Sequence, residues 1–341
     1  MVNWLKSDLM QKTTKIEISA RTIVFTVALL ILLNTLWMIR DLIFSLFIAF
    51  IIMSAVKPAV SRLERIKIPR QLSTILIFVI LIFIIVYLFF WIIPPIVIET
   101  GALIKNLPAM IASANPEIGK LLNLGAITQY LPDITGQVFS LIRGVFSNAV
   151  FLFSTIFFSF YFTIEENLIK ELLVKFFGEK EAGRAALIFE KAEERMSAWF
   201  WGELVLMTVV GLLTYLGLSL IGVRYALPLA IIAGILEAVP NLGPTLSAIP
   251  SFLVAVAQSY VLGLSVIILY FVIQQLENQL IVPQVMKKAV GLNPIVTLIA
   301  LIVGGRIGGT LGIVLAIPIT LFVETLLIEI IQTRKSNFAS S

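Results

Sequence analysis

A single carboxyl group lies inside a long apolar run near the end of the chain, next to residues that interrupt helices. The run covers 225–257, and Glu237 is its only charged residue. The residues that follow it remove backbone hydrogen bonds, permit turns or add an amide: Pro240, Asn241, Gly243 and Pro244. Unpaired backbone groups at membrane depth are tolerated only inside protein or beside water, so this break predicts a binding site. The alternative is a kink that leaves Glu237 near a membrane interface.

Amide and carboxyl side chains gather at the end of the next apolar run, 259–281. Gln274, Glu277 and Asn278 share one helical face because they are spaced i, i+3 and i+4. Oxygen ligands of this kind suit protons, hard cations and polar solutes. We therefore predict that Glu237 and Glu277 face one polar site near mid-membrane. The alternative is a polar helix end that emerges into water, since Pro283 follows closely.

A glycine-rich break interrupts the last apolar run, 291–331, and carries one cation. Its predicted hinge residues are Gly304, Gly305, Gly308 and Gly309. Arg306 lies among them and has two readings. It either pairs with Glu237 or Glu277 and contacts a polar solute, or it extends to an interface and into water.

Other chemistry is poorly represented in the sequence. There is no histidine and no cysteine, which removes the commonest proton shuttle, the commonest metal ligand and all thiol chemistry. No phosphate-binding G-x-x-x-x-G-K-[ST] loop occurs, so ATP-driven transport is not indicated. We expect no catalytic residues, no metal and no cofactor. Glu203, at the start of a predicted span, and Glu329, in the last one, are interpreted as solvated helix ends.

Composition places the chain in a membrane. Of 341 residues, 59% are hydrophobic and 13% are charged, and a soluble domain has about 25% charged residues. The basic residues give a pI near 9.4, but they cluster at the ends of apolar runs and form no stripe interleaved with aromatics. Binding to nucleic acid is therefore not expected, and the lipid bilayer is the expected surrounding.

Apolar length predicts an all-α polytopic protein with about eight membrane segments. An N-terminal anchoring and oligomerisation part, 1–200, is separated from a transport part, 201–331. The predicted spans of the first part are 22–39, 42–57, 71–93 and 144–164. The second part has spans 203–222 and 259–281 and two broken helical hairpins, 225–257 and 291–331.

Three further segments are predicted to lie outside the bilayer core. Residues 96–143 contain prolines and glycines with spaced Leu and Ile, which favours short amphipathic helices on the outer side. Residues 165–198 read as a charged amphipathic helical segment on the cytoplasmic side. Residues 332–341 form a tail.

Lys and Arg set the predicted orientation. Nineteen of them fall in segments assigned to one side and five in the opposite loops. The side rich in Lys and Arg is the cytoplasmic one, so we expect a protein of the cytoplasmic (inner) membrane with both termini in the cytoplasm. This count assumes that each broken segment returns to its own side as a re-entrant hairpin. If each crosses once instead, Lys287 and Lys288 move outside, a cost of only two charges.

The sequence resembles the autoinducer-2 exporter family, also called PerM-type permeases. The resemblance covers most of the chain and is most specific over 225–323. The residues that carry it are Glu237, Pro240, Asn241, Gly243, Pro244, Gln275, Glu277, Asn278, Pro283, Gly291, Leu292, Pro294, Gly304, Gly305, Gly308, Gly312 and Pro318. Residues 161–168 also resemble the end of the family's fourth span.

The resemblance implies about eight membrane segments, cytoplasmic termini, a homo-oligomer (expected to be a pentamer) and an elevator-like movement of the C-terminal part. It implies export of a small polar solute such as autoinducer-2. Sodium/proton antiport is the alternative, and a non-transporting membrane scaffold is a further one. Substrate, coupling ion and direction are not specified by these residues.

Overall fold

The protein is all helix over the residues that its computed structural model describes. These are residues 19–91, 149–165, 178–239, 242–286 and 293–339, with isolated positions between 94 and 109 and between 171 and 175. Six helices in them are long and apolar enough to cross a membrane, and three apolar helices are shorter. The predicted fold class is confirmed in this form. The predicted amphipathic region 96–143 lies almost wholly outside the described residues.

The chain divides into two compact units, Met1–Ile43 and Phe44–Ser341. The first contains α1 (Ala20–Met38), whose start is capped by the Ser19 hydroxyl, which accepts a hydrogen bond from the Arg21 backbone N–H at 3.3 Å. None of the α1 side chains is buried. Such an apolar, uncovered helix of 19 residues is typical of a span that faces lipid.

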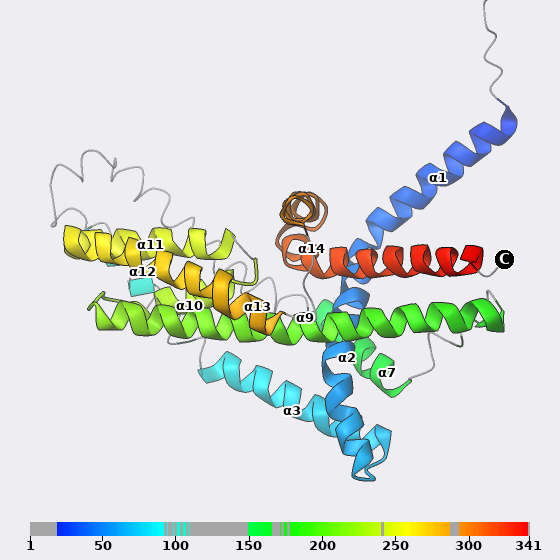
Figure 1. Cartoon of the computed structure of the whole chain (residues 1–341), viewed down its shortest axis with the longest axis horizontal. Coiled ribbons are helices and arrows are strands. Elements are labelled where there is room, and N and C mark those ends of the chain that lie inside the picture. The colour runs from blue at the N-terminus through cyan, green and yellow to red at the C-terminus, as the bar shows by residue number, and fades with distance from the viewer. Residues whose placement is uncertain are drawn as a thin grey trace, which may run out of the picture. The chain divides into compact units, whose positions relative to one another are not determined.

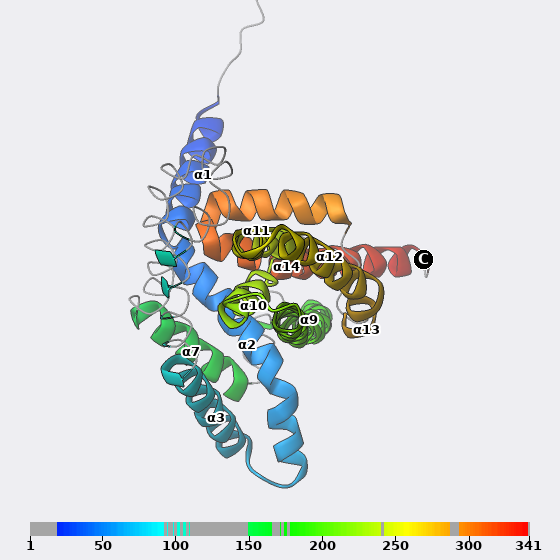
Figure 2. The ribbon, with the colours of Figure 1, turned by 90° about the vertical axis from the view of Figure 1, so that its left-hand side faces the viewer.

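Three apolar helices begin the second unit or lead into it: α2 (Arg40–Arg65), α3 (Arg70–Trp91) and α7 (Ala149–Ile164). The Phe78 ring of α3 meets the Phe160 ring of α7 edge to face at 5.3 Å. Arg70 donates through Nε and Nη2 to the Thr163 carbonyl at 3.0 and 2.9 Å, which satisfies a carbonyl at the end of α7. These contacts pair α3 with α7 (Figure 2).

The long helix α9 (Glu179–Leu220) is the spine of the second unit (Figure 1). We predicted a charged segment, 165–198, and a separate span, 203–222, whereas the structure joins them in one helix of 42 residues. No proline lies between them, and Gly202 packs against Met286, so the junction stays helical. The helix therefore runs across residue 200, where we placed the boundary between the two predicted parts.

The first predicted break is present. It separates α10 (Ala226–Leu236) from α11 (Leu242–Gln258), and these two helices form a hairpin. Its ends meet, because the Arg224 backbone N–H donates to the Gln258 side-chain oxygen at 3.3 Å. At the tip, Gly243 lies so close to the Leu236 carbonyl that a Cβ would collide with it. A glycine is therefore required for the chain to reverse here.

The next helix ends in a distorted turn. Helix α12 (Tyr260–Leu276) continues into a π-helical turn, η1 (Glu277–Ile281), and then into α13 (Val282–Val285). The Val282 N–H donates to the Glu277 carbonyl, five residues earlier. Pro283 supplies no N–H to the carbonyl four residues before it, which favours this departure from α-helical bonding.

The second predicted break is narrower than expected. Helix α14 (Pro294–Ala339) is interrupted only at Gly309, with φ 57° and ψ −136°, a conformation that side chains other than glycine rarely adopt. The other predicted hinge glycines stay helical, and two of them make close contacts, Gly304 with Gly312 and Gly308 with the Phe44 ring. The helix also continues through most of the predicted tail, because no proline or glycine follows Pro318.

Helix α9 contacts different neighbours along its length. Its C-terminal half lies against α10 (Figures 1 and 2). At this contact Gly211 faces Gly234. Its N-terminal half is joined to α14 by an ion pair between Arg195 and Glu324 at 3.0 Å. One rigid element thus links both broken segments.

Candidate functional site

Two of the predicted carboxyl groups are buried at the points where regular helix ends. Glu237 follows the last residue of α10, and its side chain is fully buried. Glu277 is the first residue of the π-helical turn, and its side chain is 3% exposed. The prediction placed both at the polar site, and the structure brings them together.

The Glu237 and Glu277 carboxyl groups lie close enough to act on each other electrostatically, although the structure forms no hydrogen bond between them. Two ionised carboxylates only accept, so a hydrogen bond joins them only when one carries a proton. Neither oxygen of Glu237 receives a hydrogen bond from any other described group. Gln274 donates weakly to Glu277, with a distance of 3.4 Å from Nε2 to Oε2. A single positive charge, such as a proton, placed between the two carboxyl groups would therefore stabilise the pair.

A third carboxyl, Glu203, was missed by the sequence reasoning. We interpreted it as a solvated helix end, and this is wrong because α9 begins at Glu179 and the Glu203 side chain is only 5% exposed. Neither of its oxygens has a hydrogen-bond partner among the described residues. It interacts electrostatically with Glu277 and with Glu237. The continuity of the charged segment into the span was the signal that would have placed it mid-helix.

Among the described residues, no Lys or Arg is paired with these three carboxyl groups, which we call the carboxyl cluster (Glu203, Glu237 and Glu277). Burying an ionised carboxylate without a partner costs several kcal/mol even after relaxation. An ionised cluster is therefore costly unless a proton or a cation from outside the described residues compensates its charge.

The geometry does not favour a resident metal. Over the described residues, no group of three or more acidic, His or Cys side chains is arranged to hold a metal ion. A proton, or a cation bound in passing, fits this arrangement better.

The remaining predicted site residues are spread more widely. Gln274 is half-buried and donates to Glu277, whereas Asn278 is exposed on the π-helical turn. Arg306 is exposed on α14 and forms no recorded ion pair with the cluster. Pro240 and Asn241 lie outside the described residues. Gly243 and Pro244 are buried in the first turn of α11.

A buried hydroxyl network ties the hairpin to α12. The Tyr270 hydroxyl lies 2.8 Å from the Ser251 hydroxyl and donates to the Ser247 carbonyl at 3.2 Å. Ser247 in turn donates to the Pro244 carbonyl at 3.0 Å. Tyr270 stands two helical turns before Glu277 on the same buried face of α12. The network fixes the hairpin next to the turn that carries Glu277.

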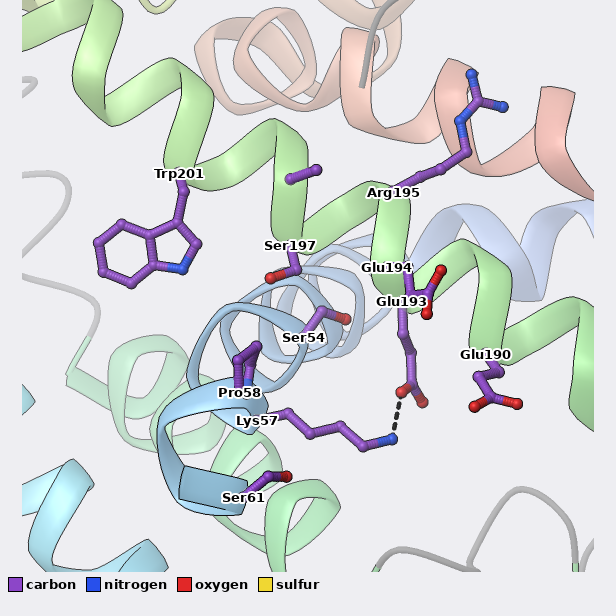
Figure 3. Close-up of a pocket in the computed structure, with 11 residues that line it drawn as sticks. Ser54, Lys57, Pro58, Ser61, Glu190, Glu193, Glu194, Arg195, Ser197 and Trp201 are labelled. Carbon is purple, nitrogen blue, oxygen red and sulfur yellow. Dashed lines mark hydrogen bonds and ion pairs between the residues drawn. The ribbon is translucent and has the colours of Figure 1, made fainter. Parts of the chain in front are cut away.

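A separate open cleft of about 750 Å³ lies between α2 and the N-terminal half of α9. Figure 3 shows Lys57 of α2 reaching across it to Glu193 of α9, with which it forms an ion pair. Arg195 points from the same region toward α14, where Glu324 binds it. The partly buried charged residues of this cleft thus each have an ion-pair partner, Lys57 with Glu193 and Arg195 with Glu324, unlike the carboxyl cluster.

Comparison with known proteins gives the family. A family model described as AI-2E family transporter matches residues 26–332, which include all three carboxyl groups and both breaks. The chain belongs to the AI-2E transporter family. The resemblance drawn from 225–323 is thereby confirmed. The protein is a multi-pass membrane transporter by family and not an enzyme.

Two curated proteins are similar along most of the chain, and others along part of it. The chain is 28% identical over 319 residues to YueF of Bacillus subtilis (strain 168), covering 87% of this chain and 86% of YueF. It is 23% identical over 337 residues to YrrI of the same organism, covering 92% and 94%. Both are named as candidate transport proteins. PerM of Escherichia coli (strain K12), named as a candidate permease, is 26% identical over 151 residues, 43% of this chain and 42% of PerM.

Proposed function

We propose that this AI-2E family protein is a secondary transporter whose Glu237–Glu277 pair binds a proton or a monovalent cation during each transport cycle. The observation that carries the proposal is the buried carboxyl pair, with which no Lys or Arg of the described residues forms an ion pair. A group that only stabilised the fold would be better served by an apolar or amide side chain. The free-energy cost of burying an unpaired carboxyl group is explained if the proton or cation that neutralises it is the ion that the protein transports.

Both carboxyl groups stand on interrupted backbone, and this supports a moving site. Glu237 caps the short helix α10, and Glu277 opens a π-helical turn. Helix ends and π-helical turns can change direction with little loss of hydrogen bonding, and π-helical turns are frequent at functional sites. A change at either break would separate the two carboxyl groups and release the shared proton or cation.

The experiment is ion-driven flux in proteoliposomes that contain the full chain. We expect an imposed pH or sodium gradient to drive flux in the wild type, and Glu237→Gln or Glu277→Gln to abolish it while the protein still assembles. Glu194→Gln is the matched control, because Glu194 is an exposed carboxylate on α9. Unchanged rates and unchanged pH dependence in both site variants would show that the pair is structural.

Two cargoes remain candidates. Export of a small polar solute such as autoinducer-2 is what the family name supports. Cation/proton antiport is favoured by the carboxyl cluster, since oxygen ligands without a fixed positive charge suit a cation. Proton efflux driven by sodium alone supports antiport, whereas flux that requires an added solute supports solute export. Absence of any driven flux would favour a membrane scaffold.

We propose an inner-membrane location with both termini in the cytoplasm, from the distribution of Lys and Arg. The hairpin of α10 and α11, whose ends meet at Arg224 and Gln258, supports a segment that returns to its own side. The chain has no cysteine, so Lys288→Cys gives one labelled position without background. Labelling of intact cells by an impermeant thiol reagent would favour single crossings instead.

We also propose that the protein is a homo-oligomer, with a pentamer expected from the family resemblance, and that its contacts use the N-terminal two-thirds. An apolar groove of about 420 Å³ between α3 and α7, which includes Phe153 and Phe157, offers area for such a contact. Native mass spectrometry in mild detergent tests this. A monomer at every protein concentration would contradict it.

In an elevator-like movement of the C-terminal part, α9 either moves with that part or stays with the N-terminal part. Because α9 is continuous from Glu179 and is joined to α14 through Arg195, we propose that it moves with the transport part. The contact that must open is then the one with α2, where Lys57 pairs with Glu193. A thiol cross-link between Lys57→Cys and Glu193→Cys should arrest transport.

The matched cross-link joins Arg195→Cys to Glu324→Cys, which lie at a contact that stays closed in this scheme. It should leave transport active. The reverse result, arrest by the second cross-link and activity with the first, would show that α9 stays with the N-terminal part.

A further inference from the structure

Glu203 is a buried carboxyl group whose placement is not explained by folding. It lies in the middle of α9, is 5% exposed, and has no hydrogen-bond partner at either oxygen. A glutamate in a transmembrane helix is costly, and those that persist usually face a pathway or a partner. Here no amide or hydroxyl of the described residues compensates the carboxyl group. A purely structural role leaves this cost unexplained.

The surroundings of Glu203 point to the transport site. Glu277 acts on it electrostatically, and Glu203 acts in turn on Glu237. The neighbouring residue, Gly202, packs against Met286 and Val285, so this turn of α9 faces the segment that follows η1. The charged and titratable groups that α10, η1 and α13 bring to this face are Glu237 and Glu277, and no Lys or Arg of the described residues is paired with them.

We propose that Glu203 is a third proton-binding group of the transport site. The inference rests on the proposed function, because it adds a member to the Glu237–Glu277 site. Glu203 also differs from the other two carboxyl groups in the backbone that carries it. Glu203 is fixed on a continuous helix, whereas the other two stand on breaks. A cluster of three carboxyl groups without a cation can exchange more than one proton per cycle, so Glu203 sets the number of protons that move.

The first test is chemical labelling of the wild-type chain in lipid vesicles. Dicyclohexylcarbodiimide reacts with protonated carboxyl groups in apolar surroundings, and peptide mass spectrometry locates the modified residue. We expect label on Glu203, falling about tenfold for each pH unit above the point at which the carboxyl loses its proton. Glu194, exposed on the same helix, should stay unlabelled. Absence of label on Glu203 at every pH, with label on Glu237, would overturn the proposal.

The second test counts protons. In vesicles under a fixed gradient, Glu203→Gln should lower the number of protons moved per cation or solute, with Glu194→Gln unchanged. Normal stoichiometry in Glu203→Gln, together with loss of flux in Glu237→Gln, would overturn this inference and leave the proposed function intact. No driven flux in the wild type would instead overturn the proposed function, and labelling of Glu203 would still decide whether it binds a proton.

Discussion

Replacing Glu237 by glutamine should stabilise the protein while it stops ion-coupled transport. In the wild type, Glu237 and Glu277 are two acceptors that face each other, and no other described group donates to Glu237. A glutamine at 237 has nearly the same shape and brings two N–H donors, one of which can bond the Glu277 carboxylate. The substitution therefore converts an unmade hydrogen bond into a made one.

The expected gain follows from that bond. A hydrogen bond to a charged group contributes about 1.5–3 kcal/mol, so we take about 2 kcal/mol. This changes the ratio of folded to unfolded protein by about thirtyfold. For a chain of this size the corresponding rise in Tm is about 3 °C. The gain should depend on pH, because a proton between the two wild-type carboxyl groups already makes the same bond.

The assay is thermal unfolding of the purified full-length protein in detergent, at about pH 6 and about pH 9. A native state that holds an extra proton loses stability as the pH rises, so the glutamine variant should gain most at the higher pH. Glu194→Gln should change stability by less than about 0.5 kcal/mol at both pH values. A variant that is less stable than the wild type at high pH would refute the reasoning, since the wild-type carboxyl would then have a partner.

Three further substitutions and one double-mutant cycle test the helices around the cluster. Gly309→Ala should destabilise by about 1–3 kcal/mol through its positive φ alone, since nothing lies within 4 Å of a Cβ there. Gly183→Ala, also without neighbours but inside α9, should stabilise by about 0.5–1 kcal/mol, and denaturant titration in detergent compares the two. Tyr270→Phe should cost about 1 kcal/mol in the same titration, because it removes the hydroxyl that joins α12 to α11; no loss would mean that the network is not formed. A double-mutant cycle at Lys57 and Glu193 should give a coupling of about 1–2 kcal/mol, and a value near zero would show that solvent screens the pair.

The helices and the breaks were largely predictable because each depends on nearby residues. Runs of apolar residues predicted α1, α2, α3 and α12 to within a few positions except at the end of α2. That helix continues to Arg65 through Pro58, since a proline on a partly exposed face need not end a helix. The break after Glu237 followed directly from a cluster of proline and glycine.

The membership of the cluster was less predictable because it depends on packing between distant segments. Glu203 is next to a glycine and follows several aromatics, a pattern that also fits a membrane interface. Asn278 and Glu277 were both placed on the face of Gln274 by helical spacing, yet in the structure Glu277 is buried and Asn278 is exposed. The side chain that faces inward after a break depends on how far the backbone turns about the helix axis at the break. The i, i+3 and i+4 spacing rules apply only within a regular helix.

The cluster also explains why the helices around it are built as they are. Three carboxyl groups without a cation favour separation, so the elements that carry them must be held by other contacts. Gly211 and Gly234 let α9 and α10 approach closely, and Tyr270 ties α11 to α12 on the opposite side. Those contacts lie on the same helices as the carboxyl groups but at other turns. Helix contacts outside the site thus oppose the repulsion between the carboxyl groups. Binding or release of one charge can therefore open or close the site without unfolding the protein.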